Sequence, residues 1–147
     1  MTEPPKNRNP ADLDTDFRAR LERALAALAA RGAPFRFDEG FRTVERQRWL
    51  YWQGRPNLRP YGRKGKIVTK NDGVKRLSNH QGHGKLGTGR GADCYPINPA
   101  TGKIFWPPPP SADSVWLAYA EAGEAEGLIA GLRWKSVDSP HVELRKK

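Results

Sequence analysis

The sequence predicts a single α+β domain built from a small, mostly antiparallel sheet with helices packed on it. Three observations predict this class. Apolar residues recur at helical spacing in separate segments, short alternating segments indicate strands, and the two kinds do not alternate regularly as in a parallel sheet. The 147 residues, 37% hydrophobic and 29% charged, fit one globular domain without internal repeats. We expect residues 1–13 to form a flexible N-terminal tail before a domain over 14–147.

The first half of the domain contains two expected helices. The first begins near Thr15, with Asp14 or Thr15 as its cap, and stops at Gly32 and Pro34. A short strand follows over 34–37, and a second helix runs from Thr43 to Gln53. The apolar face of the first helix consists of Phe17, Leu21, Leu25 and Leu28, and that of the second of Trp49, Leu50 and Trp52.

The second half has more turns. Glycine and proline predict a loop over 54–66, and strands are expected over 66–69 and 92–97. Residues 97–105 predict a hairpin, and the prolines at 107–110 predict a stiff connector. A helix follows over 111–128, capped by Ser111 or Asp113, and the segment 132–144 predicts two short strands around a turn.

Charge and cysteine content limit the possible classes. The net charge is +10, and the segment 54–76 and the chain end at 145–147 are strongly basic. Such a charge attracts nucleic acid, anionic lipid or anionic cell-wall polymers, and plain solubility is the alternative. No apolar run is long enough for a transmembrane helix, and residues 1–14 lack the apolar core of a secretory signal. The single cysteine, Cys94, excludes an intramolecular disulfide.

The candidate chemistry lies in the stretch SNHQGHGKLGTGRGAD (78–93) and in DSPHVEL (138–144). The chain has three histidines, His80, His83 and His141, and carboxylates at Asp93 and Asp138 lie near them in sequence. Two histidines and one carboxylate form a catalytic zinc site in known enzymes, and the fourth position is left for water. A further carboxylate beside that water acts as general base.

Three separated segments carry a resemblance to a known family. DEGFRTVERQRWLY (38–51) is similar to the pattern G-[FY]-R-[ST]-x-x-x-Q, SNHQ…GRGADCYP to S-x-H-x-x-G-x-A-x-D, and GLRWKSVDSPHVEL to W-x-x-x-D-x-x-H-[FV]-E. These are the motifs of the zinc D-Ala-D-Ala carboxypeptidase and L-alanyl-D-glutamate endopeptidase family, which includes many phage endolysins. They occur in the family's order and cover roughly residues 35–145. The resemblance implies a zinc peptidase domain of the hedgehog and DD-peptidase type.

The resemblance also implies roles for single residues. His80, Asp93 and His141 match the three zinc ligands, and Asp138 matches the general base. Arg42 matches the arginine that stabilises the oxyanion. Two further residues, Gln47 and Ser78, match positions that support the site.

Two choices remain open at this point. His80 and Asp93 are thirteen residues apart, more than is usual in the family, because of the glycine-rich insertion 82–88. Either His80 is the ligand and the insertion bulges out, or His83 is the ligand; the S-x-H start favours His80. In a strand, Glu143 shares a face with His141. It is therefore the rival to Asp138: either Glu143 approaches the metal directly, or it orients a metal ligand through a hydrogen bond.

The resulting hypothesis is a monomeric zinc peptidoglycan hydrolase that cuts the stem peptide between L-Ala and D-Glu. A D-Ala-D-Ala carboxypeptidase is the alternative within the family, and a basic nucleic-acid-binding protein is the alternative outside it, although no nucleic-acid motif is present. We expect a phage endolysin that is made in the host cytoplasm and reaches peptidoglycan after another protein permeabilises the membrane. Its basic surface is expected to concentrate it on the anionic envelope.

Overall fold

The computed structural model describes residues 2–55, 64–107 and 111–145, except for the side chains of 111–113. Within these ranges the chain folds as a small α+β domain, which confirms the predicted class. The helices are α1 (Thr15–Ala30), α2 (Val44–Tyr51) and α3 (Ser111–Ala125), and the strands are β1 (Phe35–Glu39), β2 (Gly91–Pro96), β3 (Ile129–Ala130) and β4 (His141–Glu143). Three short 3-10 turns complete the list: η1 (Pro10–Asp12), η2 (Asn79–Gln81) and η3 (Gly131–Arg133).

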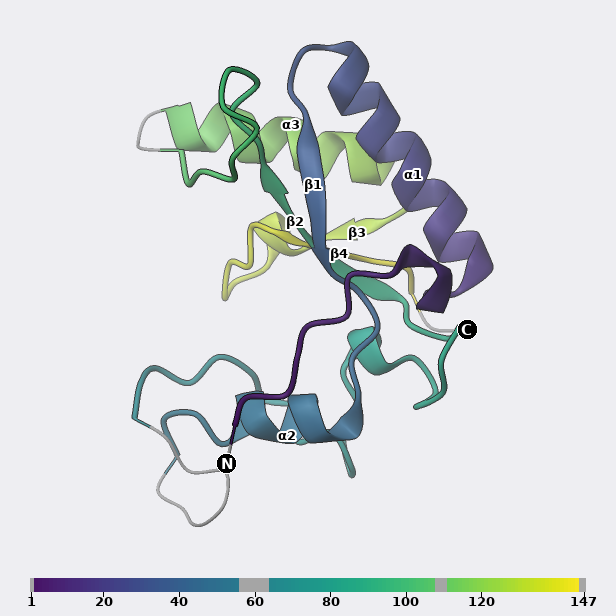
Figure 1. Ribbon diagram of the computed structural model, residues 1–147, viewed down its shortest axis with the longest axis vertical. Helices are drawn as coiled ribbons and strands as arrows, with labels where there is room; N and C mark the ends of the chain where they lie inside the picture. Colours follow the sequence, from purple (N-terminus) through teal and green to yellow (C-terminus); the bar gives the residue numbers. More distant parts are fainter. Residues whose placement is uncertain (1, 56–63, 108–110, 146–147) are drawn as a thin grey trace.

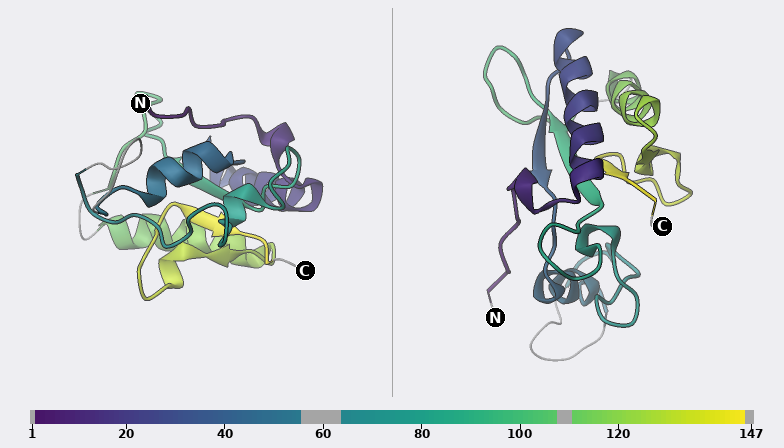
Figure 2. Two further views of the ribbon diagram at one scale, coloured as in Figure 1. Left: turned by 90° about the horizontal axis from the view of Figure 1, so that it is seen from below. Right: turned by 90° about the vertical axis from the view of Figure 1, so that its right-hand side faces the viewer.

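The four strands form one antiparallel sheet in the order β1-β2-β4-β3. Helices α1 and α3 pack against each other and against the sheet, and α2 lies apart from them beyond the end of β1 (Figures 1 and 2). Side chains alternate between the two faces of a strand. The buried residues Ala92, Cys94 and Val142 therefore face the helices, and Asp93 and His141 face the other way.

Helix α1 shows how the sequence builds the core. The Asp14 side chain accepts a hydrogen bond from the Phe17 amide, as expected of an N-cap. Phe17, Leu21 and Leu28 are at most 2% exposed and pack on β2, α3 and β4. Burying each such side chain contributes roughly 1.5–3 kcal/mol. Cys94 belongs to the same core and is not part of the polar face of the sheet.

Three predicted elements differ in the structure. The strand expected over 66–69 is a loop, because Ile67 and Val68 are more than half exposed and have no sheet face to bury. In the segment 132–144, the first of the two expected strands is absent: the strand β3 lies just before the segment, and the segment begins within the 3-10 turn η3. Helix α3 ends at Ala125 because Gly127 adopts a positive φ of 77°. The hairpin at 97–105 closes through one bridge between Ile97 and Ile104.

The N-terminal segment, predicted as a flexible tail over 1–13, makes specific contacts in its described part. Leu13 is 1% exposed and belongs to the core, and Lys6 and Arg8 form ion pairs with Asp38. The Gly40 amide donates to the carbonyl oxygen of residue 7. Its flexibility stays a prediction, but the domain boundary at 14 leaves out a core residue.

Several predicted features lie outside the described residues. These are most of the connector at 107–110, the side chains of the capping candidates Ser111 and Asp113, and the basic residues Arg59, Arg63, Lys146 and Lys147. In the part of the chain that is described, no helix has the length and apolar character needed to cross a membrane.

Candidate metal centre

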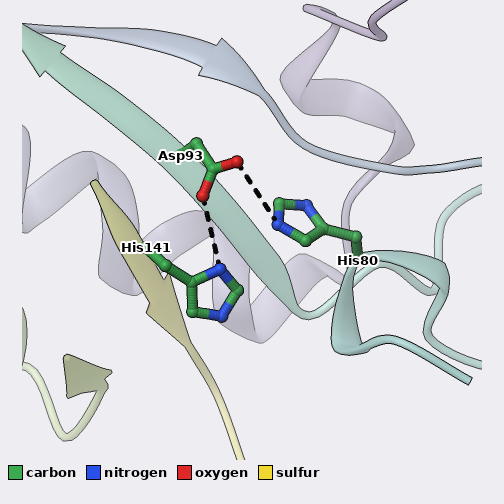
Figure 3. A group of neighbouring side chains, drawn as sticks. All are labelled: His80, Asp93 and His141. Atoms are coloured by element: carbon green, nitrogen blue, oxygen red, sulfur yellow. Dashed lines mark hydrogen bonds and ion pairs between the residues drawn. The ribbon is translucent and has the colours of Figure 1, made fainter. Parts of the chain in front are cut away.

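Three predicted ligands, His80, Asp93 and His141, converge on the polar face of the sheet (Figure 3). One Asp93 oxygen lies 3.6 Å from His80 Nε2 and the other lies 3.3 Å from His141 Nδ1. One donor atom from each residue lies within 4.8 Å of the other two. Zinc bonds of about 2.0–2.1 Å at tetrahedral angles hold ligand atoms roughly 3.3 Å apart, so this donor set fits such an ion with small adjustments.

The local fold explains the convergence. Asp93 and His141 are direct partners in the β2–β4 register, so their side chains share one face of the sheet. His80 comes from η2, where Ser78 and Gln81 form a capping box that fixes the start of the turn. Ser78 thus holds the backbone of the turn that carries His80, and its supporting role at the site stays a prediction. Gly91 faces the cluster as well, because a Cβ there would lie only 3.0 Å from the His141 ring.

Hydrogen bonds fix which ring nitrogens face Asp93. His80 Nδ1 lies 2.8 Å from the Gly40 carbonyl oxygen, which can only accept, so the neutral tautomer of this ring carries its proton on Nδ1, and Nε2 lies toward Asp93. His141 Nε2 lies 2.7 Å from a Glu143 oxygen, which leaves Nδ1 toward Asp93. The other Glu143 oxygen accepts a hydrogen bond from the side-chain amide of Asn79. Glu143 thus orients a ligand from behind, as metal sites commonly require.

The electrostatics suit a site that binds a cation. Burial opposes ionisation of Asp93, but the charges and hydrogen bonds of His80 and His141 hold the pKa of Asp93 well below its usual range. Burial also opposes a charge on His141, but hydrogen bonds to Asp93 and Glu143 raise the pKa of His141 to about 9. A metal ion would take the place of the extra His141 proton.

Arg42 lies beside this cluster and is buried. Its Nη2 and Nε donate to Glu39 at 2.8 and 3.3 Å, and its Nη1 donates to Gln47 at 2.9 Å. Nη2 also lies 3.7 Å from Asp93. Gln47, which is fully buried, ties Arg42 to the loop that follows by donating to the Asn71 carbonyl oxygen at 2.8 Å.

Asp138 lies between η3 and β4 and has solvent-exposed surface. Partial burial of its carboxyl and the negative charge of Asp93 raise the pKa of Asp138, while the positive groups nearby oppose the shift. Its backbone is fixed, because its amide donates to the Gly131 carbonyl oxygen and its own carbonyl accepts from the His141 amide. The Trp134 ring lies beside the His141 ring, with the ring centroids 5.1 Å apart and the planes tilted by 41°.

The structure thus separates the two candidate histidines. His80 is buried in the cluster, and His83 lies exposed in the loop 82–88, outside the group. The metal-binding role of the cluster and the role of Asp138 stay predictions. Sequence reasoning missed Glu39, Asn79 and Gly40, which hold the predicted residues in place. For Glu39, the sequence did contain a signal, because this acidic residue lies shortly before Arg42 and Arg46.

Comparisons with known proteins agree with the motifs. No family model matches the chain. Among curated proteins, it is similar to the peptidoglycan L-alanyl-D-glutamate endopeptidase CwlK of Bacillus subtilis (strain 168), with 29% identity over 140 residues, 92% of this chain and 75% of that protein. Among solved structures, it resembles the Serratia marcescens L-Ala D-Glu endopeptidase ChiX with a TM-score of 0.50 and 24% identity. That match covers 96% of this chain and 90% of the other.

The chain is therefore similar in sequence to a peptidoglycan L-alanyl-D-glutamate endopeptidase. The likeness to ChiX shows that the two share a fold. The insertion 82–88 forms a turn-rich loop, and its residues 83–87 are exposed. Gly82 permits this loop, because it has a φ of 57° and a Cβ there would lie 1.7 Å from the Thr88 carbonyl oxygen.

Proposed function

We propose that this protein is a zinc-dependent peptidoglycan peptidase that hydrolyses the bond between L-Ala and D-Glu in the stem peptide. The observation that carries the proposal is the His80–Asp93–His141 group, with both histidines buried, on the polar sheet face of a chain similar to an L-alanyl-D-glutamate endopeptidase. The two relatives described above are both L-Ala-D-Glu endopeptidases by name, and this favours that bond over the D-Ala-D-Ala bond.

Zn²⁺ suits the donor set better than Mg²⁺ or Ca²⁺, because two imidazoles and one carboxylate are its ordinary ligands. When bound, Zn²⁺ supplies a Lewis acid and lowers the pKa of a water molecule to about 7. The chain's own contribution is to hold His80 Nε2, His141 Nδ1 and one Asp93 oxygen toward a common point. The Gly40 carbonyl and the Glu143 carboxylate fix both rings in the required tautomers.

Asp138 is the proposed general base. Its raised pKa makes its carboxylate a better proton acceptor than an ordinary aspartate, and the influence of Asp93, His141 and His80 on that pKa supports a position close to them. It would take a proton from the attacking water and transfer it to the leaving amine. Arg42 would favour the negative charge that develops on the carbonyl oxygen, and its position is set by Glu39 and Gln47.

The second candidate is a D-Ala-D-Ala carboxypeptidase, which the same donor set would serve. We further propose that the protein acts as a phage endolysin, made in the host cytoplasm and released through a permeabilised membrane. The net charge of +10, with exposed cations such as Lys64, Lys66 and Lys70, would concentrate it on the anionic envelope. Cell-wall binding that falls steeply with added salt would support this electrostatic role.

Digestion of purified peptidoglycan, with and without a chelator, tests the proposal. We expect chelator-sensitive release of fragments with a new N-terminal D-Glu, identified by mass spectrometry. Asp138→Asn should lower the rate by about 10²–10⁴ and leave Zn²⁺ binding intact. Asp16→Asn, the same change on the exposed side of α1, should leave the rate unchanged.

Each other outcome has a clear meaning. Loss of terminal D-Ala alone would move the protein to the carboxypeptidase function. Full activity in the chelator would overturn the metal-dependent reaction, and full activity of Asp138→Asn would overturn the general-base assignment. A protein that binds Zn²⁺ and cuts no peptidoglycan would overturn the hydrolase proposal as a whole.

A further inference from the structure

The N-terminal strap, which we define as residues 3–9, crosses the region between the sheet and α2. In Figure 1 its purple trace runs from beside α2 to η1 at the start of α1. Its side chains are mostly exposed, so a large apolar core does not hold it in place. Its contacts are polar and fall on the short segment Asp38–Glu39–Gly40 and on Arg46.

Asp38 anchors the strap. Its side chain is 7% exposed, and both of its described ion pairs are with the strap: Lys6 Nζ lies 2.6 Å from one oxygen and Arg8 Nε lies 3.2 Å from the other. A buried carboxylate needs a cation or hydrogen bonds in place of the water that it loses. The strap supplies both cations, so the strap and the Asp38 side chain hold each other in place.

The strap is linked to a predicted metal ligand through one residue. The Gly40 amide donates to the Asn7 carbonyl oxygen at 2.9 Å, and the Gly40 carbonyl oxygen accepts from His80 Nδ1 at 2.8 Å. Gly40 is also closely packed, because a Cβ there would lie 2.5 Å from the Phe37 ring. A displacement of residue 40 would therefore move the acceptor that fixes the His80 tautomer.

A second connection runs through buried arginines. The Pro4 carbonyl oxygen accepts from Arg46 Nη1 at 2.8 Å, and Arg46 Nε donates to Glu39. Glu39 in turn holds Arg42, whose Nη2 lies 3.7 Å from Asp93. The strap thus contacts Gly40 behind His80 directly, and it reaches Arg42 beside Asp93 only through Arg46 and Glu39.

We propose that the N-terminal strap is a positioning element for the metal centre, which holds Gly40 so that His80 presents Nε2 to the ion. The inference rests on the proposed metal-dependent function. Groups behind metal ligands commonly change metal affinity by about 10- to 100-fold when they are removed. The strap contacts Gly40 and not His80 itself, so we expect the decrease in metal affinity to lie at the lower end of this range.

The test compares two double variants of the full chain. Lys6→Ala with Arg8→Ala removes both cations from Asp38. The control, Arg18→Ala with Arg23→Ala, removes two exposed cations of α1, which pair with Glu22 and Glu126. Zn²⁺ affinity is measured by competition with a chromophoric chelator. We expect the strap variant to raise the Kd about tenfold, the control to stay within about twofold of the original protein, and Lys6→Arg with Arg8→Lys to restore the affinity.

A second measurement uses the metal-free protein. Hydrogen exchange of the Gly40 amide should be faster in the strap variant than in the control, and ¹⁵N shifts of the His80 ring should show loss of the single Nδ1–H tautomer. If the original protein binds no Zn²⁺, the proposed function fails, and these two readouts still decide on the strap. Equal Kd values, or equal Gly40 exchange, in strap variant and control would overturn the proposal. If the double variant does not fold, the single variants Lys6→Ala and Arg8→Ala are measured instead. Kd values or Gly40 exchange rates equal to those of the control would then overturn the proposal.

Discussion

Glu39 is a buried carboxylate between two buried guanidinium groups, and its replacement by glutamine should be costly. Its side chain is 4% exposed, and those of Arg42 and Arg46 are 9% and 5% exposed. It accepts two hydrogen bonds from Arg42 and one from Arg46. Glu39→Gln keeps the size of the side chain, but it removes the charge and replaces one acceptor oxygen by a donor that faces a cation.

The expected loss follows from this geometry. Removing one partner of a buried ion pair costs about 3–5 kcal/mol, because the remaining charge stays buried. The glutamine oxygen still accepts one hydrogen bond, so we expect a decrease of about 3 kcal/mol in the free energy of unfolding. Burial raises the pKa of Glu39, but Arg42, His80 and Arg46 outweigh it and lower the pKa below its ordinary value of 4.5. Its stabilisation is therefore complete above the unfolded-state pKa and is lost as the pH falls through the lower folded-state pKa.

Urea denaturation in the presence of a chelator, followed by tryptophan fluorescence, measures the effect without any contribution from metal. Glu22→Gln is the matched control, because Glu22 forms an exposed pair with Arg18 at 3.6 Å, and such pairs contribute about 0–1 kcal/mol. The difference between the original protein and Glu39→Gln should be constant above about pH 5 and should shrink below about pH 4.5. A loss no larger than that of the control, or a difference that grows in acid, would refute this account of Glu39.

Three further predictions concern other described residues. Glu143→Gln should weaken Zn²⁺ binding about 10- to 100-fold in chelator competition, because the carboxylate behind one imidazole ligand is lost; an unchanged Kd would contradict its orienting role. Gly82→Ala should cost about 2 kcal/mol more in urea denaturation than Gly84→Ala, because both have positive φ but only Gly82 lacks room for a Cβ; equal costs would contradict this. Tyr119→Phe should cost about 1–2 kcal/mol in the same assay, because the buried hydroxyl donates to the Pro140 carbonyl at 2.8 Å, and a neutral substitution would show that this bond contributes nothing.

Local patterns in the sequence predicted the elements that bury apolar side chains. Helix α1 begins one residue after Asp14 and buries Phe17, Leu21 and Leu28, as its spacing indicates. The loop at 66–69 has the β-branched residues of a strand, but a strand also needs a neighbour and a face to bury. Neither requirement can be read from the segment itself, so the prediction of a strand there was wrong.

The polar network behind the site could be predicted only in part. The motif positions of Arg42 and Gln47 indicated that they belong near the cluster. Their actual partners, Glu39 and the loop at 69–71, depend on how α2 packs, which no short pattern encodes. The N-terminal strap shows the same limit, because its proline-rich, charged composition is typical of a tail. Its contacts with Asp38, Gly40 and Arg46 depend on the tertiary fold, which its composition does not encode.

The long spacing between His80 and Asp93 does not weaken the assignment of His80. The Arg90 amide donates to the Asn79 carbonyl oxygen at 2.8 Å, so the chain closes on itself immediately outside the insertion. Residues inside that closed loop can be added without moving either end, and lengthening a loop costs little free energy. Asp93 is in turn placed by its pairing with His141 across the sheet, which does not depend on the loop. The number of residues between two predicted ligands is therefore a poor guide to their distance in this fold. The backbone hydrogen bonds beside them, from Arg90 to Asn79 and between the strands of Asp93 and His141, are a better guide.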